Sequence, residues 1–140
     1  MMNNIETRPT WDDYFKQLAI LTASRSVCPR LKVGCILVND NRVISQGYNG
    51  YLSGCPHEAI MCDGHNVGTI HAEQNSITDC AKRGVSCNNA TAYITHYPCF
   101  NCMKLLTASG IKKINYIDDY NNDEKVLHIS KISGVLINKI

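Results

Sequence analysis

Two short motifs, each at the expected start of a helix, constrain this chain more than any other feature of its sequence. They are His-Ala-Glu at 71–73 and Pro-Cys-Phe-Asn-Cys at 98–102. Cys99 and Cys102 are three residues apart, so on a helix both sulfurs lie on one face, and the positive end of the helix dipole favours thiolates there. Two thiolates and the imidazole of His71 suit Zn²⁺ and leave the fourth position of a tetrahedral site open, as a catalytic site requires.

Helical periodicity alone does not bring His71 and Glu73 together, because residues i and i+2 do not face each other on a helix. His-x-Glu followed by Pro-Cys-x-x-Cys is, however, the signature of zinc-dependent deaminases, and in this respect the chain resembles them. The resemblance implies that His71, Cys99 and Cys102 hold one catalytic Zn²⁺. It also implies that Glu73 takes a proton from the zinc-activated water and passes protons to the ring nitrogen and the departing amine. The competing interpretation is a closed structural zinc site, or two buried cysteines beside a surface histidine.

Further stretches narrow the resemblance to deoxycytidylate deaminases of viral and bacterial type. They are RPTWDDYF at 8–15, KVG at 32–34, GYNG at 47–50, SGCP at 53–56, HAEQN at 71–75, THYPC at 95–99 and GIKK at 110–113. The chain is identified as a member of this family. Membership implies the conversion of dCMP to dUMP and ammonia, which supplies dUMP for dTMP synthesis, and it leaves open whether dCTP is also deaminated to dUTP.

The same resemblance implies roles for four residues in substrate binding. Asn49 would hold the sugar, Ala72 would contact the base through its backbone, and Tyr97 would wall the pocket. Asn49 precedes Gly50, so it is equally well explained as a turn residue, and the two roles are compatible. Two interpretations of Tyr120 stay open: it contacts the substrate phosphate, or it is a partly buried aromatic residue at the end of a strand.

Family resemblance also implies a regulated assembly. Members are commonly homohexamers activated by dCTP and inhibited by dTTP, with Mg²⁺ expected to accompany a nucleoside triphosphate effector. The glycine-rich loop at 47–50 would border the regulatory site. These expectations rest on the resemblance alone.

A second cluster of metal-ligating residue types lies mostly in the stretch 47–70. Its members are Cys28, Cys55, His57, Cys62 and His65. A long irregular segment in a compact domain is usually functional or held by something, and a structural Zn²⁺ bound by some of these residues would hold it. The alternative is small buried cysteines together with histidines on a solvated loop.

Composition limits the other classes of protein. The 140 residues predict one domain, 1–140, and 44% hydrophobic residues are enough for a core. A net charge of +2 without a basic run argues against a protein that binds DNA or RNA through its backbone. The polar residues 1–10 offer no secretory signal and no apolar stretch is long enough to span a membrane, so we predict a reduced, cytoplasmic protein without disulfides. Two alternatives stay open: a polynucleotide cytidine or adenosine deaminase, and an inactive zinc-stabilised binding protein.

Local patterns predict a three-layer α/β domain whose later strands are partly parallel. The family resemblance implies that this is an α/β/α fold of the cytidine-deaminase type with a mixed five-stranded sheet. The expected helices are 11–25, 71–83 with Gly84 as its end, 98–109 with Gly110 as its end, and 123–132. The expected strands are 33–38 and 42–45, forming a hairpin, followed by 90–95, 113–117 and 135–137. Residues 47–70 show no periodicity.

Overall fold

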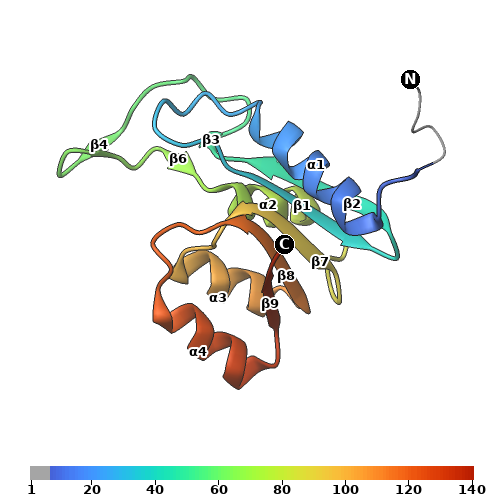
Figure 1. The fold of residues 1–140 in the computed structure, drawn as a ribbon. Coiled ribbons are helices and arrows are strands. Elements are labelled where there is room, and N and C mark those ends of the chain that lie inside the picture. The colour runs from blue at the N-terminus through green and yellow to red at the C-terminus, as the bar shows by residue number, and fades with distance from the viewer. Residues whose placement is uncertain (1–6) are drawn as a thin grey trace.

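The computed structural model describes residues 7–140, and it confirms three layers built around a mixed five-stranded sheet (Figure 1). The helices are α1 (Trp11–Ala23), α2 (Ala72–Arg83), α3 (Phe100–Ala108) and α4 (Glu124–Ser133). The sheet contains β1 (Gly34–Asn39), β2 (Arg42–Tyr48), β7 (Thr91–His96), β8 (Lys113–Asp118) and β9 (Leu136–Lys139), in the order β2-β1-β7-β8-β9. β1 is antiparallel to both of its neighbours, and β7, β8 and β9 are parallel. Residues 1–6, part of the polar stretch that argues against a signal, lie outside the described residues.

Alternate side chains of β1 divide the core between the two faces of the sheet, as the two-residue repeat of a strand requires. Ile36 and Val38 pack with Phe15 of α1 on one face. Cys35 and Leu37 point to the opposite face and join the larger cluster, which α2, α3 and α4 cover. β1 is therefore buried on both sides, which explains its continuous apolar sequence.

Most predicted element boundaries agree with the structure to within two residues. α1 ends at Ala23 and not at residue 25, because the N–H groups of Arg25 and Ser26 donate to carbonyls three residues earlier, as in a turn and not an α-helix. Gly84, with φ of 70°, ends α2 as predicted. β2 extends to Tyr48, three residues beyond the predicted strand. In residues 7–140 no helix has both the length and the apolar character needed to span a membrane.

The stretch 47–70 contains short strands that its sequence does not predict. β3 (Gly50–Tyr51) pairs with β6 (Thr69–Ile70), and β4 (Met61–Cys62) pairs with β5 (His65–Asn66). We call residues 52–68 the arm, since they project from the body of the molecule (Figure 1, left).

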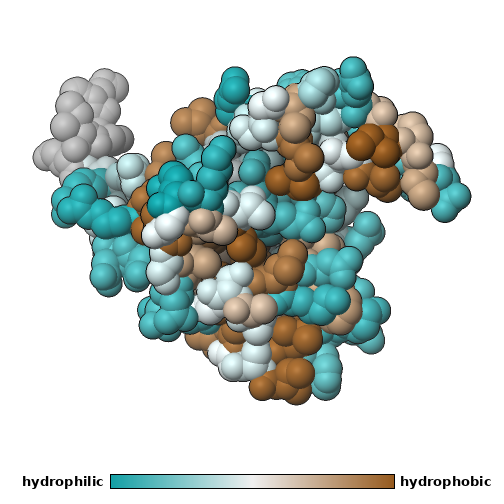
Figure 2. Space-filling view, turned by 180° about the vertical axis from the view of Figure 1, so that it is seen from behind, coloured by the Kyte–Doolittle hydropathy of each residue, from teal (hydrophilic) through white to brown (hydrophobic). Residues whose placement is uncertain are grey.

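The arm has exposed apolar side chains and is organised by one polar residue. Brown patches mark the arm at the right of Figure 2, and its exposed apolar residues are Leu52, Ile60, Met61 and Val67. The side-chain oxygen of Asn66 accepts hydrogen bonds from the backbone N–H groups of Ile60 and Gly68, at 3.0 and 3.1 Å. Its amide nitrogen donates to the hydroxyl of Tyr51. Hydrogen bonds of this kind follow no periodic sequence pattern, which is why the arm could not be predicted.

Substitution of Gly34 by Ala is expected to lower the free energy of unfolding by about 3 kcal/mol, through overpacking. A Cβ atom at Gly34 would lie 2.6 Å from the backbone nitrogen of Ala23, and closer still to the carbonyl oxygen of Ala19. Helix α1 would therefore have to move away from β1. Gly50→Ala is the control, because the nearest atom to its added Cβ is 4.0 Å away. Urea unfolding of both variants measures the difference, and equal midpoints would contradict the close packing of α1 on β1.

Candidate active site

The two sequence motifs lie at the N-termini of neighbouring helices, and each helix begins just after a candidate metal ligand. His71 and Cys99 are the N-cap residues of α2 and α3, and both have extended backbone, with ψ of 159° and 165°. The predicted helices therefore start slightly too early, since a capping residue lies outside the helical turn. The N–H of Cys102 donates to the Cys99 sulfur at 3.4 Å, so Cys99 serves as both cap and candidate ligand.

The donor atoms of His71, Cys99 and Cys102 have the spacing of a tetrahedral zinc site. His71 Nδ1 lies 3.3 Å from Cys102 Sγ and 3.6 Å from Cys99 Sγ. With usual Zn–N and Zn–S bond lengths, the nitrogen and sulfur of a tetrahedral site are about 3.6 Å apart. In residues 7–140 no other group of three histidine, cysteine or acidic side chains comes together in this way. Cys102 is buried and His71 is exposed, so the cluster has an open side.

Electrostatics at the cluster favour a thiolate. The hydrogen bond with Cys102 lowers the pKa of the Cys99 thiol to about 4; burial opposes this effect, and a further hydrogen bond with His71 supports it. The hydrogen bond with Cys99 raises the pKa of the Cys102 thiol, and burial raises it further. The cluster therefore favours a thiolate at Cys99, and a bound divalent cation would favour thiolates at both cysteines, since a coordinated thiol is deprotonated.

Glu73 lies in the first turn of α2, next to the cluster but not part of it. Its side chain is only 5% exposed, and this burial raises the pKa of its carboxyl group to about 7. A neighbouring dication would act in the opposite direction, because it favours the charged carboxylate. A buried carboxyl group with a shifted pKa beside three metal-ligand types is a typical feature of an active site.

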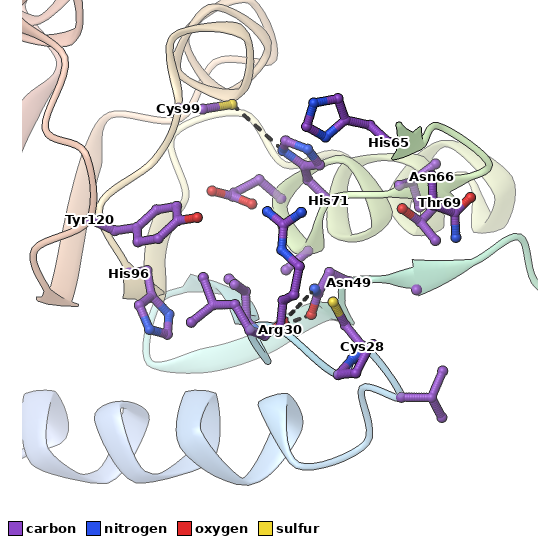
Figure 3. A pocket seen from close by; sticks show the side chains of 18 of the residues that line it. Cys28, Arg30, Asn49, His65, Asn66, Thr69, His71, His96, Cys99 and Tyr120 are labelled. Atoms are coloured by element: carbon purple, nitrogen blue, oxygen red, sulfur yellow. Dashed lines mark hydrogen bonds between the residues drawn. The ribbon is translucent and has the colours of Figure 1, made fainter. Parts of the chain in front are cut away.

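A pocket of about 580 Å³ opens beside the cluster and Glu73 (Figure 3). Its walls include all four residues for which the sequence predicts a role in substrate binding: Asn49, Ala72, Tyr97 and Tyr120. The buried ring of Tyr97 packs edge-on against Tyr116, with 4.9 Å between centroids. Tyr120 is 43% exposed and its ring is T-shaped to His96. The structure brings these residues to one cavity, and their individual roles stay predictions.

One arginine and two further histidines also line the pocket: Arg30, His65 and His96. No motif in the sequence indicates a role for His96. It is the last residue of β7, however, and ligand-binding sites of α/β proteins form at the carboxyl ends of their strands. His96 Nδ1 is 2.8 Å from the hydroxyl of Thr95. Burial lowers the pKa of His96.

The structure does not gather the proposed second set of metal ligands. Those residues are Cys28, Cys55, His57, Cys62 and His65, and within residues 7–140 no three of them form a metal-binding group. Cys28 lies in the segment before β1, while the ring of His57 stacks on Tyr51, 5.1 Å away. The second zinc site therefore stays a prediction, and in this structure hydrogen bonds of Asn66 and short strand pairs hold the arm.

Comparisons with known proteins identify a family for most of the chain. Residues 9–118 match the model of the cytidine and deoxycytidylate deaminase zinc-binding region. The chain is 41% identical to ComE operon protein 2 of Bacillus subtilis, over 95% of this chain and 72% of that protein. It is 37% identical to the deoxycytidylate deaminase of Schizosaccharomyces pombe, over 96% of this chain but only 45% of the yeast protein.

A solved structure agrees with these matches. The dCMP deaminase of the cyanophage S-TIM5, in complex with dCMP and dUMP, superimposes with a TM-score of 0.84 and 31% sequence identity. The superposition covers 96% of this chain and 99% of the phage protein. Both the fold and nearly the full length of that enzyme are thus reproduced here.

Proposed function

Since the chain belongs to the cytidine and deoxycytidylate deaminase family, we propose that it hydrolyses dCMP to dUMP and ammonia. One observation carries the proposal: His71 and Cys99 of the three-residue cluster line the same pocket as the buried Glu73. The similarity to a phage enzyme solved with dCMP and dUMP supports this choice of substrate.

The proposed roles follow from the geometry of the site. His71, Cys99 and Cys102 would hold one zinc ion, which their spacing fits. Bound zinc lowers the pKa of a water molecule so that hydroxide is available near neutral pH. The carboxylate of Glu73 would accept one proton of that water and deliver it to N3 of cytosine as the water oxygen bonds to C4. It would then take the second proton from this oxygen and pass it to the 4-amino group, so that the C4–N bond breaks and ammonia leaves. The reaction consumes one water and releases one ammonia.

The walls of the pocket would orient the base. The backbone of Ala72, the first residue of α2, lies between the candidate ligand His71 and Glu73 in the chain, so a base that contacts this backbone would lie next to both. The ring of Tyr97 is fixed by Tyr116 and would exclude water from one side of the base. Tyr120 carries a hydroxyl at the rim of the pocket, where we propose that it contacts the substrate phosphate.

Ammonia release with identification of the product tests the function. The substrates are dCMP, CMP, dCTP, deoxycytidine and a cytosine-bearing oligonucleotide, each supplied to zinc-loaded protein. We expect the highest kcat/KM with dCMP. Preference for the oligonucleotide would favour a polynucleotide deaminase, and turnover of no substrate by zinc-loaded protein would favour an inactive binding protein.

Finer features of the activity are also proposals. Activation by dCTP with Mg²⁺, inhibition by dTTP, turnover of dCTP and assembly into a homohexamer all rest on the family resemblance, and a cytoplasmic location is a further proposal from the sequence. Repeating the dCMP assay with each nucleotide added, with and without Mg²⁺, tests regulation, and sedimentation of the same protein gives the oligomer number.

A further inference from the structure

A second cavity lies at the start of α1, and the proposed function gives its residues no role. Six of the eight residues in the stretch 8–15 line one of its walls. Residues 40–43, at the turn between β1 and β2, line the opposite wall. Figure 1 shows this turn beside the start of α1, on the right. The cavity has a volume of about 1050 Å³, and we call it the α1 groove.

The α1 groove and the active-site pocket lie at opposite ends of the same two elements. The groove is lined by the first residues of α1 and β2, whereas the pocket is lined by residues that follow the last residues of both. Among the described residues, none lines both cavities. α1 has 13 residues, so its two ends are about 20 Å apart. A ligand in the groove would therefore be separate from the substrate, and also from a regulatory site beside the loop 47–50.

The groove contains an open aromatic face. The ring of Trp11 stacks on the buried ring of Phe15, with 5.6 Å between centroids and 16° between planes. Trp11 is nevertheless 55% exposed, so its accessible surface lies mainly on the face away from Phe15. Tyr14 stands at its edge, with 6.0 Å between centroids and 76° between planes. A fixed, exposed indole of this kind is a platform on which a planar base can stack.

Charged side chains lie on both walls of the groove. Arg8 and Arg42 are exposed, and in residues 7–140 neither of them forms an ion pair. A guanidinium can donate two parallel hydrogen bonds to a phosphate group. Asp40 is the one carboxylate among the described residues of the groove, so the charge there is positive. A carboxylate repels phosphate, but it accepts hydrogen bonds from the hydroxyls of a ribose.

These features together match the parts of a nucleotide: an aromatic base, a sugar with hydroxyl groups, and phosphates. The groove is nearly twice as large as the active-site pocket of about 580 Å³, which favours a two-ring base. We propose that the α1 groove binds a purine ribonucleotide with two or more phosphates. Its base would stack on Trp11, its ribose would contact Asp40, and its phosphates would lie at Arg8 and Arg42. The inference goes beyond the proposed function and does not depend on it.

Trp11 is the only tryptophan in the chain, so its fluorescence reports directly on the groove. Titration of the zinc-loaded protein with ATP should quench this fluorescence to saturation, at one ATP per chain. Adenosine and inorganic triphosphate should each bind more weakly than ATP, because each lacks one part of the ligand. dATP should also bind more weakly, since it lacks the 2′-hydroxyl. dCMP, the proposed substrate, should leave the emission of Trp11 unchanged.

Variants assign the binding to the groove. Arg8→Gln and Arg42→Gln should each weaken ATP binding by about 10-fold, as the loss of a hydrogen bond to a charged group predicts. Lys131→Gln is the matched control: this exposed cation lies in α4, on the other side of the sheet, and ATP binding should not change. Asp40→Asn should remove the preference for ATP over dATP. Trp11→Ala, followed by calorimetry, should weaken ATP binding by about 5- to 150-fold, through loss of the stacked base.

Three results would overturn the inference: no saturable change of emission with ATP, an unchanged ATP affinity in Arg42→Gln, or the same change of emission with dCMP. Emission that depends on protein concentration and not on ATP would also overturn it, because a second copy of the chain would then cover the groove. Thermal unfolding of each variant separates lost binding from lost fold. Failure of the proposed function is recognised separately, because the ATP titration requires no turnover of dCMP.

Discussion

Replacement of Glu73 by Gln is expected to lower kcat for dCMP by about 10³-fold while leaving the zinc content at the value of the unaltered protein. General acid–base catalysis contributes about 10²- to 10⁴-fold, and Glu73 would act in more than one proton transfer. Gln has nearly the same shape, so the packing around the buried side chain is kept, but its amide cannot carry a proton between water, ring nitrogen and amine. Glu73 lies outside the ligand cluster, so zinc should remain bound. Steady-state ammonia release and metal analysis of the same preparation measure both quantities.

Glu124→Gln is the matched control for this substitution. Glu124 also lies in the first turn of a helix, α4, but its side chain is exposed. The control should keep full activity. If Glu73→Gln retained more than about a tenth of the activity, another group would have to carry the protons, and the role of Glu73 would be limited to shaping the pocket.

The sequence predicts those parts of the fold whose stability depends on periodic packing and on local capping. The helical repeat in α1 and the continuous apolar run in β1 fit the observed core, in which β1 is buried on both faces, and Gly84 ends α2 as expected. The ligand cluster was also predictable, but only through a family signature. Helical periodicity gives no reason for Cys99 to lie near His71, 28 residues earlier in the chain, and the structure supplies that reason by placing both at helix N-termini.

The arm and the segment before β1 depend on single hydrogen bonds between segments, and such bonds produce no periodic pattern in the sequence. Asn66 organises the arm, and Asn49 accepts a hydrogen bond from Val33 in the segment before β1, yet no pattern in the sequence indicates either of these contacts. For the same reason, cysteines and histidines of the arm resemble a metal site in sequence although the fold keeps them apart. Arg30 could not be distinguished from Arg25 or Lys32, because only the fold decides which cation faces the cavity.

Removal of zinc is expected to abolish activity and to lower the melting temperature, and both should return when one zinc per chain is restored. An ion that binds only the native state stabilises it by RT ln(1 + [Zn]/Kd), which is about 2.7 kcal/mol at a zinc concentration 100 times Kd. The metal-free cluster has lost both this stabilisation and the source of hydroxide near neutral pH. Dialysis against a chelator, followed by titration with zinc under calorimetry and by the dCMP assay, measures the two effects together.

Two sets of cysteine variants assign the ion to its site. Cys102→Ser should lose zinc and activity, because Cys102 is the buried ligand and a serine hydroxyl is a poor zinc donor. Cys55→Ser and Cys62→Ser should keep one zinc per chain and full activity, since both residues are exposed and lie outside the cluster. A second equivalent of zinc in the unaltered protein that disappears in Cys62→Ser would show that the arm binds metal after all. The same result would mean that a metal ion supports the hydrogen bonds of Asn66 in holding the wall of the pocket that carries His65.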